Sequence, residues 1–335
     1  MKKSYYLFNP GRIERKDNTL CFIMKDSEGN DMQPKYLPVE GIESLYILGS
    51  LDANSALFNF LGKHQISVHF FDYYEHYTGS FQPKEYLLAG RMQVEQTRTY
   101  LELPRRLHLA KGLVDGATSN MLRNLKYYCT RGRSLEEHIK TIELYRESIF
   151  KVNNVSELMG IEGNCRQVYY DAFEYIVNDF EMKGRTKQPP SNELNALISF
   201  GNALCYTRVL DSIYHTQLNP TISFLHEPGA RRYSLALDIA EIFKPILVDR
   251  TIFVLTNKKE IQAKHFEQTL NGILLNQKGR QTFIQTFEER LKETIQHRVL
   301  NKKVSYKYLI QLECYKIAKY IIGTANAYKP FKIWW

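Results

Sequence analysis

The segment FLHEPGARRYSLALDIAEIFKP, residues 224–245, combines a histidine with two acids in a setting that could support chemistry. Residues 235–243 are mostly apolar and predict a buried helix, which carries Asp238 and Glu241. The two acids are three residues apart, so both side chains leave one face of that helix. His226 lies twelve residues before Asp238, in a loop rich in Pro, Gly and Arg. Because a buried carboxylate is costly unless it is paired or binds a cation, the segment predicts either salt bridges or a cation site.

A further acid, Glu162, lies in MGIEGNCRQVYY, residues 159–170, between Gly160 and Gly163. The two glycines are expected to let this turn of helix approach another backbone closely. A hard divalent cation takes several oxygen ligands from separate elements, and Glu162 would add one to the acids of the first segment. Each group also has a plainer interpretation, with Glu162 as a surface carboxylate and His226 as a capped or solvated loop histidine.

Salt bridges are the alternative for the two acids of the apolar helix. Arg231, Arg232 and Lys244 all lie close to Asp238 and Glu241 in the sequence. On the residues alone, structural ion pairs and a cation site remain equally open for these two acids.

The elements that must hold these residues change character near residue 90. Up to that point short apolar runs alternate with turn signals, as in YYLFNPG and TLCFIMKDSEGND, which predicts strands and hairpins. One exception, residues 51–65, predicts a short helix capped by Asp52 or Asn54 and ended by Gly62. We therefore expect an α+β protein, with a small β-rich domain at residues 1–90 and a larger all-α domain at residues 91–335.

Helical spacing of apolar residues supports this expectation along the second part of the chain. Residues 92–129 carry apolar residues at helical spacing, and residues 281–300 form part of the helical segments that follow. The segment EMKGRTKQPPSNE, residues 181–193, reads as a loop, after which Asn192 and Glu193 are expected to start the next helix.

Charge is distributed unevenly between the two parts. Residues 1–90 hold 9 Lys and Arg against 11 Asp and Glu, whereas residues 91–335 hold 36 against 25. The basic excess therefore belongs to the second part, and it indicates either a polyanionic partner there or a charge that serves solubility alone.

Composition excludes several other classes of protein. No stretch approaches the roughly 20 apolar residues of a membrane span, and the N-terminal MKKSYYLFNPGRIERKDN lacks the apolar core of a secretory signal. Five cysteines are scattered without CxxC spacing, namely Cys21, Cys129, Cys165, Cys205 and Cys314. We interpret them as reduced thiols of a cytoplasmic protein.

The sequence resembles the CRISPR-associated spacer-acquisition integrases, the larger of the two core adaptation proteins. In the β-rich part the resemblance rests on NTLCF, YLPVEGIESLYILG and VHFFDYYEHYTGSFQP. In the helical part it rests on GIEGNCRQVYYDAF, GRTKQPPSNELNALISFGNALCY and FLHEPGARRYSLALDIAEIFKPILVDR, in this order. The likeness covers nearly the whole chain.

For the site, this resemblance implies a divalent-metal centre. The family pattern of a Glu, then a His, then an acid falls on Glu162, His226 and Glu241, which would be the metal ligands. Asp238 falls where the family has another acid near the site, and it would orient the ligands or serve as an alternate ligand. Many relatives have Asp at the position of Glu241, one methylene shorter. One histidine among carboxylates suits Mg²⁺ or Mn²⁺ better than a structural zinc site.

The resemblance also implies an enzyme that inserts a short DNA duplex, the prespacer, into a CRISPR array. Each prespacer 3′-hydroxyl would attack a phosphodiester of the repeat, and with water as nucleophile the same site would act as an endonuclease. The implied partners are DNA, a second copy of this chain bound through the β-rich domain, and a second, small ferredoxin-like adaptation protein. The expected location is the cytoplasm, without a membrane.

The basic second part supplies candidate phosphate contacts, which would hold a duplex without reading its sequence. Arg166 is four residues after Glu162 and lies on the same helical face. The other candidates flank the Pro-Pro loop or follow His226, and they are Arg185, Lys187, Arg231 and Arg232.

Three functions remain open at this point. The first is the DNA integrase, and the second is a stand-alone metal-dependent nuclease or phosphoesterase without array integration. The third is a nucleic-acid-binding module whose acids serve only structure. Strand joining, metal-dependent cleavage alone, or DNA binding without any metal effect would distinguish the three.

Overall fold

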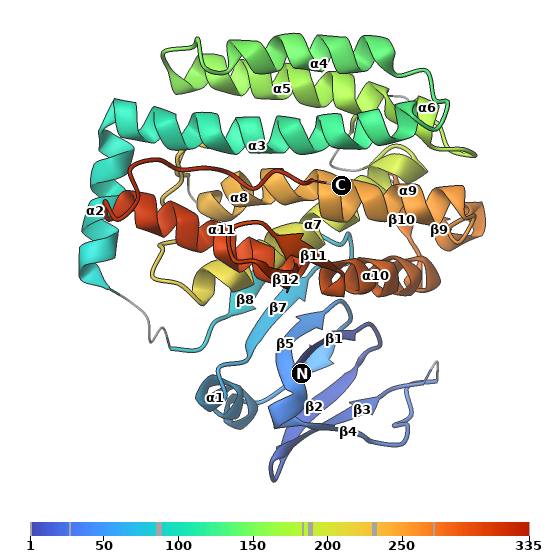
Figure 1. The fold of residues 1–335 in the computed structure, drawn as a ribbon. Helices are drawn as coiled ribbons and strands as arrows, with labels where there is room; N and C mark the ends of the chain where they lie inside the picture. Colours follow the sequence, from blue (N-terminus) through green and yellow to red (C-terminus); the bar gives the residue numbers. More distant parts are fainter. Residues whose placement is uncertain are drawn as a thin grey trace. The chain divides into compact units, whose positions relative to one another are not determined.

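The chain divides into two compact units, Met1–Tyr86 and Leu87–Trp335. The computed structural model describes residues 2–26, 28–84, 89–182, 184–186, 190–229, 233–270 and 272–334. The smaller unit is rich in strands and the larger is mainly helical, so the α+β class expected from the sequence is confirmed (Figure 1).

The described part of the smaller unit forms two four-stranded sheets. One sheet has the order β1-β5-β7-β8, in which β1, β5 and β7 are parallel and β8 runs antiparallel to β7. The other has the order β4-β3-β2-β6, with β2, β3 and β4 antiparallel. The strands are β1 (Lys3–Leu7), β2 (Gly11–Lys16), β3 (Thr19–Met24), β4 (Lys35–Pro38), β5 (Ile42–Ile47), β6 (Leu51–Asp52), β7 (Ser67–Phe71) and β8 (Tyr77–Phe81).

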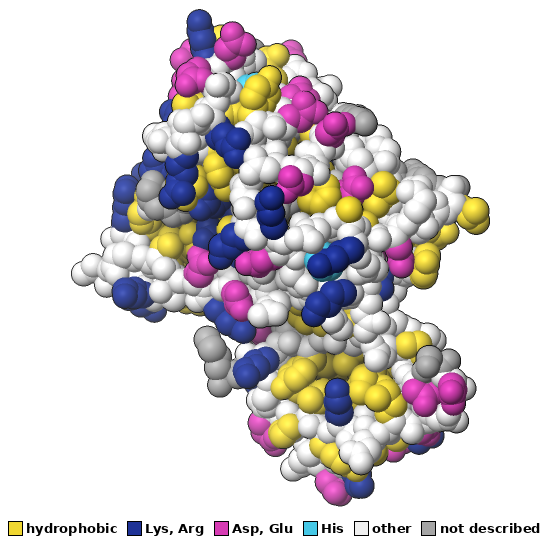
Figure 2. Space-filling model, turned by 90° about the vertical axis from the view of Figure 1, so that its right-hand side faces the viewer, with side chains coloured by type: hydrophobic (Ala, Val, Ile, Leu, Met, Phe, Trp, Pro, Cys, Tyr) yellow, Lys and Arg dark blue, Asp and Glu magenta, His cyan; other side chains and the backbone are white. Residues whose placement is uncertain are grey.

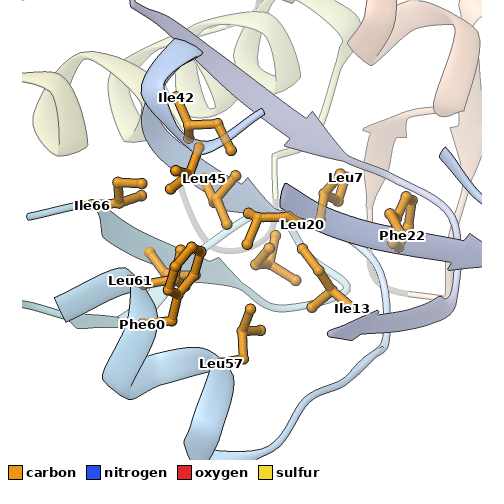
Figure 3. Packing of buried hydrophobic residues seen from close by; sticks show 13 residues of the cluster. Leu7, Ile13, Leu20, Phe22, Ile42, Leu45, Leu57, Phe60, Leu61 and Ile66 are labelled. Carbon is orange, nitrogen blue, oxygen red and sulfur yellow. The ribbon is translucent and has the colours of Figure 1, made fainter. Parts of the chain in front are cut away.

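A single apolar core joins these sheets to the short helix α1 (Ser55–Lys63) (Figure 3). Ile13 and Leu20 come from one sheet, Leu45 from the other, and Leu57 from α1. As the sequence predicts, the Asn54 side chain caps this helix, accepting a hydrogen bond from the Leu57 N–H at 3.0 Å. The helix ends one residue beyond the predicted Gly62.

The larger unit is organised around one long helix, α3, which contacts α4 and α5 as well as α8 (Figure 1). Helix α7 packs on α8 in turn. The helices are α2 (Gly90–Leu101), α3 (Leu103–Cys129), α4 (Glu136–Ser148), α5 (Val155–Asp171), α6 (Phe173–Ile176), α7 (Glu193–Tyr214), α8 (Ser234–Lys244), α9 (Arg250–Asn257), α10 (Gln277–Lys292) and α11 (Tyr306–Ile321). Because α3 contacts both α5 and α8, it fixes the two helices that carry the candidate acids relative to each other.

Helix starts follow the predicted capping chemistry. The Asn192 side chain accepts a hydrogen bond from the Asn195 N–H at 2.8 Å, so α7 begins where the sequence predicts it. The helical spacing predicted over residues 92–129 is confirmed, but it belongs to two helices, α2 and α3, separated at Glu102, whose backbone is extended. Pro104 lies in the first turn of α3, where its missing N–H is tolerated, and it would interrupt a continuous helix.

The second departure from the sequence interpretation lies in residues 281–300. Helix α10 ends at Lys292, and β11 (Thr294–His297) then pairs with β12 (Lys302–Ser305) as a hairpin. A further pair, β9 (Phe266–Gln268) and β10 (Ile273–Leu275), lies earlier in the unit. The larger unit is thus helical with two short hairpins among its described residues. In each hairpin the backbone N–H and C=O groups pair with the partner strand, where helical spacing alone predicts pairing within a helix.

Helix α8 does not end freely but continues into a π-helical turn, Pro245–Asp249, and then into α9. Pro245 has no N–H to donate to the preceding turn, which favours a local change in hydrogen-bond spacing. The turn is buried and packs against α7 and α3.

Two composition-based expectations concern the whole chain. Among the residues with described positions, no helix combines the length and apolar character needed to cross a membrane. All five cysteines are described and are free thiols, four of them buried.

Close packing of α7 against the π turn generates a stability prediction at Gly201. A Cβ at this position would lie 2.4 Å from Val248 Cγ1 and 2.8 Å from the Phe283 ring. We expect Gly201→Ala to lower the free energy of unfolding in urea by about 1–3 kcal/mol.

Gly163→Ala is the matched control, because the added Cβ on α5 meets no described atom within 4 Å. It should raise the free energy of unfolding by about 0.5–1 kcal/mol, since alanine restricts the unfolded chain more than glycine. A Gly201→Ala variant as stable as Gly163→Ala would show that α7 and the π turn are not tightly packed.

Candidate metal centre

Two buried carboxylates from different helices meet at one guanidinium group. Glu162 lies on α5 and Glu241 on α8, and they are 7% and 3% exposed. The Arg166 Nη2 donates to Glu162 Oε1 and also to Glu241 Oε2. Because a single nitrogen reaches both carboxylates, the two acids lie close enough to share one cation.

Glu241 has a second cation, Lys244, one helical turn further along α8. The Lys244 Nζ donates to Glu241 Oε1 at 2.6 Å. The salt-bridge alternative raised by the sequence therefore applies to Glu241, with Lys244 and Arg166 as partners. Burial alone would raise the pKa of Glu241, but Arg166 and Lys244 hold it well below its usual range. Glu241 is therefore ionised at neutral pH, as a metal ligand must be.

Asp238, one turn before Glu241, is fully buried, and its carboxylate contacts residues 224–226 of the loop that carries His226. Its Oδ2 accepts from the backbone N–H groups of Phe224 at 2.7 Å and Leu225 at 2.9 Å. Its Oδ1 accepts from the His226 N–H at 3.0 Å and lies 2.8 Å from His226 Nδ1. These contacts occupy the Asp238 carboxylate, which supports the predicted orienting role over that of an alternate ligand.

The contact with Asp238 also decides which nitrogen of His226 is available. When Nδ1 donates to a carboxylate, the imidazole carries its lone pair on Nε2. The side chain of His226 is 17% exposed, so this nitrogen remains within reach of a ligand.

The structure thus assembles the four predicted residues as two pairs joined by α8. One pair is Glu162 with Glu241, and the other is His226 with Asp238. Within the described ranges, no three His, Cys, Asp or Glu side chains lie close enough to hold one metal ion. Two ionisable carboxylates around one cation, with an oriented imidazole near the same helix, nevertheless fit the donor set of Mg²⁺ or Mn²⁺.

A further acid, Asp249, was missed by the sequence analysis. It ends the π turn, is 2% exposed, and its Oδ1 has no hydrogen-bond partner among the described residues. Burial raises the pKa of Asp249 to about 7, against the opposing effects of a hydrogen bond from Tyr169 and the charges of Lys244 and Arg166. The signal in the sequence was an acid within the apolar run ILVDRTIFVL, the same pattern that singles out Asp238.

Two of the candidate phosphate-binding arginines have partners inside the protein. Arg166 contacts the two glutamates as described above. Arg185 donates to Asn195 Oδ1 at 2.9 Å and to Ser199 Oγ at 3.1 Å, so it ties the preceding loop to α7. Their contacts with DNA stay predictions.

The remaining candidates, Lys187, Arg231 and Arg232, lie outside the described residues. Glu227, an acid of the same loop, accepts hydrogen bonds from Tyr100 at 2.7 Å and from Arg106 at 2.5 Å. It thus ties the loop to the α2–α3 region.

The expectation of a close backbone approach at Gly160 and Gly163 is wrong. Both glycines are exposed, and a Cβ at either would meet nothing within 4 Å in the described structure. They lie on the outer side of α5, whereas Glu162 points inward, because successive helical residues are about 100° apart.

A basic and aromatic cavity of about 510 Å³, which no sequence motif indicated, lies in the larger unit. Arg250 lies over the Tyr127 ring at 4.3 Å and Arg290 over the Tyr306 ring at 4.4 Å. Figure 2 shows that Lys and Arg side chains gather along one edge of this unit. The cavity is lined by Arg123, Lys126, Tyr127, Thr130, Arg250, Arg290, Glu293, Thr294, Ile295 and Tyr306. Four basic groups line the cavity with Glu293, and one of them, Lys126, also pairs with Glu143, so the net charge there is positive and suits an anionic ligand.

The fold and the site together define a two-unit α+β protein whose helical unit holds two buried glutamates on one arginine and a histidine paired with a buried aspartate. Residues 5–289 match the family model described as CRISPR associated protein Cas1, and the chain belongs to this family. The resemblance seen in the sequence motifs is thereby confirmed.

Relatives and solved structures agree over almost the full length. The CRISPR-associated endonuclease Cas1 of Fusobacterium nucleatum is 44% identical over 336 residues, which cover 100% of this chain and 98% of that protein. The structure of a Cas1 protein from Thermotoga maritima, 38% identical, has a TM-score of 0.85 and covers 98% of this chain and 99% of that one. A casposase bound to integration product has a TM-score of 0.87 at 21% identity, covering 98% and 93%, a likeness of fold alone.

The buried Asp249 predicts a distinctive pH dependence. Its pKa is raised to about 7 in the folded protein, whereas the pKa of an Asp in an unfolded chain is about 3.9. Between these values the folded state binds the extra proton, so this group's contribution to stability is lost as the pH rises toward 7.

Asp249→Asn removes that titration. Between pH 5 and pH 7.5 the native chain loses this stability and the variant does not. The free energy of unfolding of the variant minus that of the native chain should therefore increase by on the order of 2–3 kcal/mol over this range. Urea unfolding of both proteins at the two pH values measures the change. A stability difference that is the same at both pH values would contradict a protonated Asp249.

Proposed function

We propose that this protein is a divalent-metal-dependent DNA endonuclease and integrase that inserts short foreign DNA fragments, prespacers, into a CRISPR array. The observation that carries the proposal is the pair of buried carboxylates, Glu162 and Glu241, that share the Arg166 guanidinium. Asp238, on the same helix as Glu241, holds His226. Two comparisons support the reaction class. The Fusobacterium nucleatum relative is named as an endonuclease, and the casposase of the same fold is bound to an integration product.

Glu162 and Glu241 would supply the oxygen ligands and His226 Nε2 the nitrogen ligand. The bound Mg²⁺ or Mn²⁺ would lower the pKa of the attacking hydroxyl and neutralise charge on the phosphate. Asp238 keeps the imidazole in the tautomer that presents Nε2, and at the same time it fixes the backbone of residues 224–226.

Arg166 would change partner when substrate and metal are present. In this structure its guanidinium balances the charge of Glu162 and Glu241. Its side chain is 21% exposed, so it has a route from these carboxylates to a phosphate at the mouth of the site. An arginine suits that position because its planar donors match two phosphate oxygens.

The reaction itself is a transesterification. The 3′-oxygen of the prespacer forms a new bond to the phosphorus of the repeat, and the bond to the displaced strand breaks, so that this strand leaves with a 3′-hydroxyl. With water in place of the 3′-hydroxyl, the same geometry hydrolyses DNA. This common geometry is the reason to propose both activities for one site.

The partners proposed for this activity follow the charge distribution and the family resemblance. The basic larger unit would hold DNA, and the Arg250 and Arg290 cavity is a candidate contact for its backbone. The smaller unit would form the homodimer, and Figure 2 shows a patch of hydrophobic side chains on its surface. A second, small ferredoxin-like adaptation protein would complete the assembly in the cytoplasm.

Loss of any ligand should abolish strand joining. Glu162→Gln, His226→Ala and Glu241→Gln are each expected to reduce integration by about 10²-fold or more, since even partners that only orient a ligand cost 10- to 100-fold. The assay uses labelled prespacer, an array plasmid, the small partner and MnCl₂. Glu157→Gln is the control, because Glu157 is an exposed acid of the same helix as Glu162.

Asp238→Ala should lose part of the activity and also lower the melting temperature, because three backbone N–H groups and His226 lose their acceptor. A ligand variant with native strand joining would remove that residue from the site. Cleavage without strand joining in the native protein would favour the stand-alone nuclease.

Arg231 and Arg232, the two arginines that follow His226, are candidate contacts for the DNA backbone. If Arg231 and Arg232 hold the DNA backbone, replacing both with alanine weakens binding to every sequence alike. It also flattens the plot of log affinity against log salt by about 0.9 per lost contact. The alternative is that they hold the loop, in which case the melting temperature falls and the slope is unchanged.

Lys258 and Lys259 offer a matched control, since they are adjacent, side-chain exposed by 66% and 67%, and paired only with Glu260 and Asp179 at 3.9 and 3.8 Å in the salt bridges described. Their double alanine variant removes the same charge and should leave the slope nearly native. Equal slopes in the two double variants would show that net charge, and not contact by Arg231 and Arg232, sets the salt dependence.

A further inference from the structure

Asp249 is a buried acid to which the proposed reaction assigns no role. Its carboxylate is 2% exposed, and Oδ1 has no hydrogen-bond partner among the residues with described positions. Leaving a buried polar atom unsatisfied is costly, and such atoms in folded proteins call for a specific reason. The π turn that ends at Asp249 contacts α8, and the charges of Lys244, Arg166 and Glu241 act on this carboxylate, so it lies near the proposed metal centre.

The π turn explains how Asp249 comes to lie near Lys244. In an α-helix, residues five apart point about 140° away from each other. A π-helical turn closes its hydrogen bonds between residues five apart, and so brings them above one another. Lys244 is the residue that precedes the turn and Asp249 is its last residue. The irregular turn therefore places the Asp249 carboxylate on the side of the helix that Lys244 occupies.

Lys244 needs a second position if Glu241 binds a metal ion. Its ammonium now lies 2.6 Å from Glu241 Oε1, and its side chain is only 12% exposed. A divalent ion on the same carboxylate would repel it strongly at such short range, where solvent screening is weak. A buried ammonium that simply lost its carboxylate would in turn be left uncompensated.

We propose that Asp249 is the positioning residue that receives the Lys244 ammonium when a divalent cation takes the carboxylate of Glu241. This inference rests on the proposed function, because it requires a metal at Glu241. Arg166 differs in that its side chain has more exposure, at 21%, and so it has a route to solvent or to phosphate. The raised pKa of Asp249 agrees with a carboxyl group held in reserve, since the arrival of Lys244 would ionise it.

A binding measurement on the metal-free full chain tests this transfer. Isothermal titration with MnCl₂ compares the native protein with Asp249→Asn, Lys244→Met and the double variant. Asp249→Asn should weaken Mn²⁺ binding by about tenfold, as for other residues that support metal ligands. In the Lys244→Met background the same substitution should have no effect, because no ammonium has to be received.

Asp115→Asn is the control for the loss of a buried carboxylate elsewhere. Asp115 is 4% exposed on α3 and pairs with Arg146 and Lys332. This variant should bind Mn²⁺ with native affinity. Native affinity in Asp249→Asn, or the same loss in both backgrounds, would overturn the inference and leave the proposed function standing. A native protein that binds no Mn²⁺ would count against both.

If Asp249→Asn does not fold, Lys244→Met decides the question alone. With Asp249 as receiver, displacement of Lys244 costs little, so removing the ammonium should change the Mn²⁺ affinity by less than about threefold. Tighter binding by about tenfold or more would mean that Lys244 has no second partner, and would overturn the inference.

Discussion

The structure of the helical unit depends on the electrostatic problem of burying Glu162 and Glu241 together. Two carboxylates in a water-poor interior repel each other and lose hydration, so a cation must lie between them. Arg166 supplies it in this structure, with Lys244 on the other oxygen of Glu241. A group that replaces Arg166 and Lys244 at these carboxylates must be attracted to them at least as strongly. A divalent ion, with twice the charge, meets this requirement.

The acids on α8 and its π turn show how environment assigns different roles to similar groups. Asp238 has its lone pairs taken by three backbone N–H groups and by His226, so it is an anchor. Glu241 meets two cations and stays ionised. Asp249 has few partners, and burial favours its neutral form. One continuous helical segment thus carries three acids in different environments, for which we propose the roles of orienting acid, metal ligand and receiver of Lys244.

How much of this followed from sequence depends on the range of the interactions. The strand-rich first part, the Asn54 and Asn192 caps and the buried helix around Asp238 rest on local patterns, and the structure contains them. The hairpin β11–β12 was missed because each of its strands is stabilised by hydrogen bonds to the other, and neither is recognisable from its own sequence pattern. The meeting of Glu162 with Glu241 depends on α3 holding α5 and α8, a tertiary fact that only the family resemblance anticipated.

The central claim is that Glu162 and Glu241 share one divalent ion with His226. The most direct measurement is the anomalous difference density of the protein crystallised with MnCl₂. The account predicts one strong peak bonded to oxygens of both glutamates and to His226 Nε2, with Arg166 moved off the carboxylates. A map without a peak there, in which Arg166 still bridges Glu162 and Glu241, would contradict it.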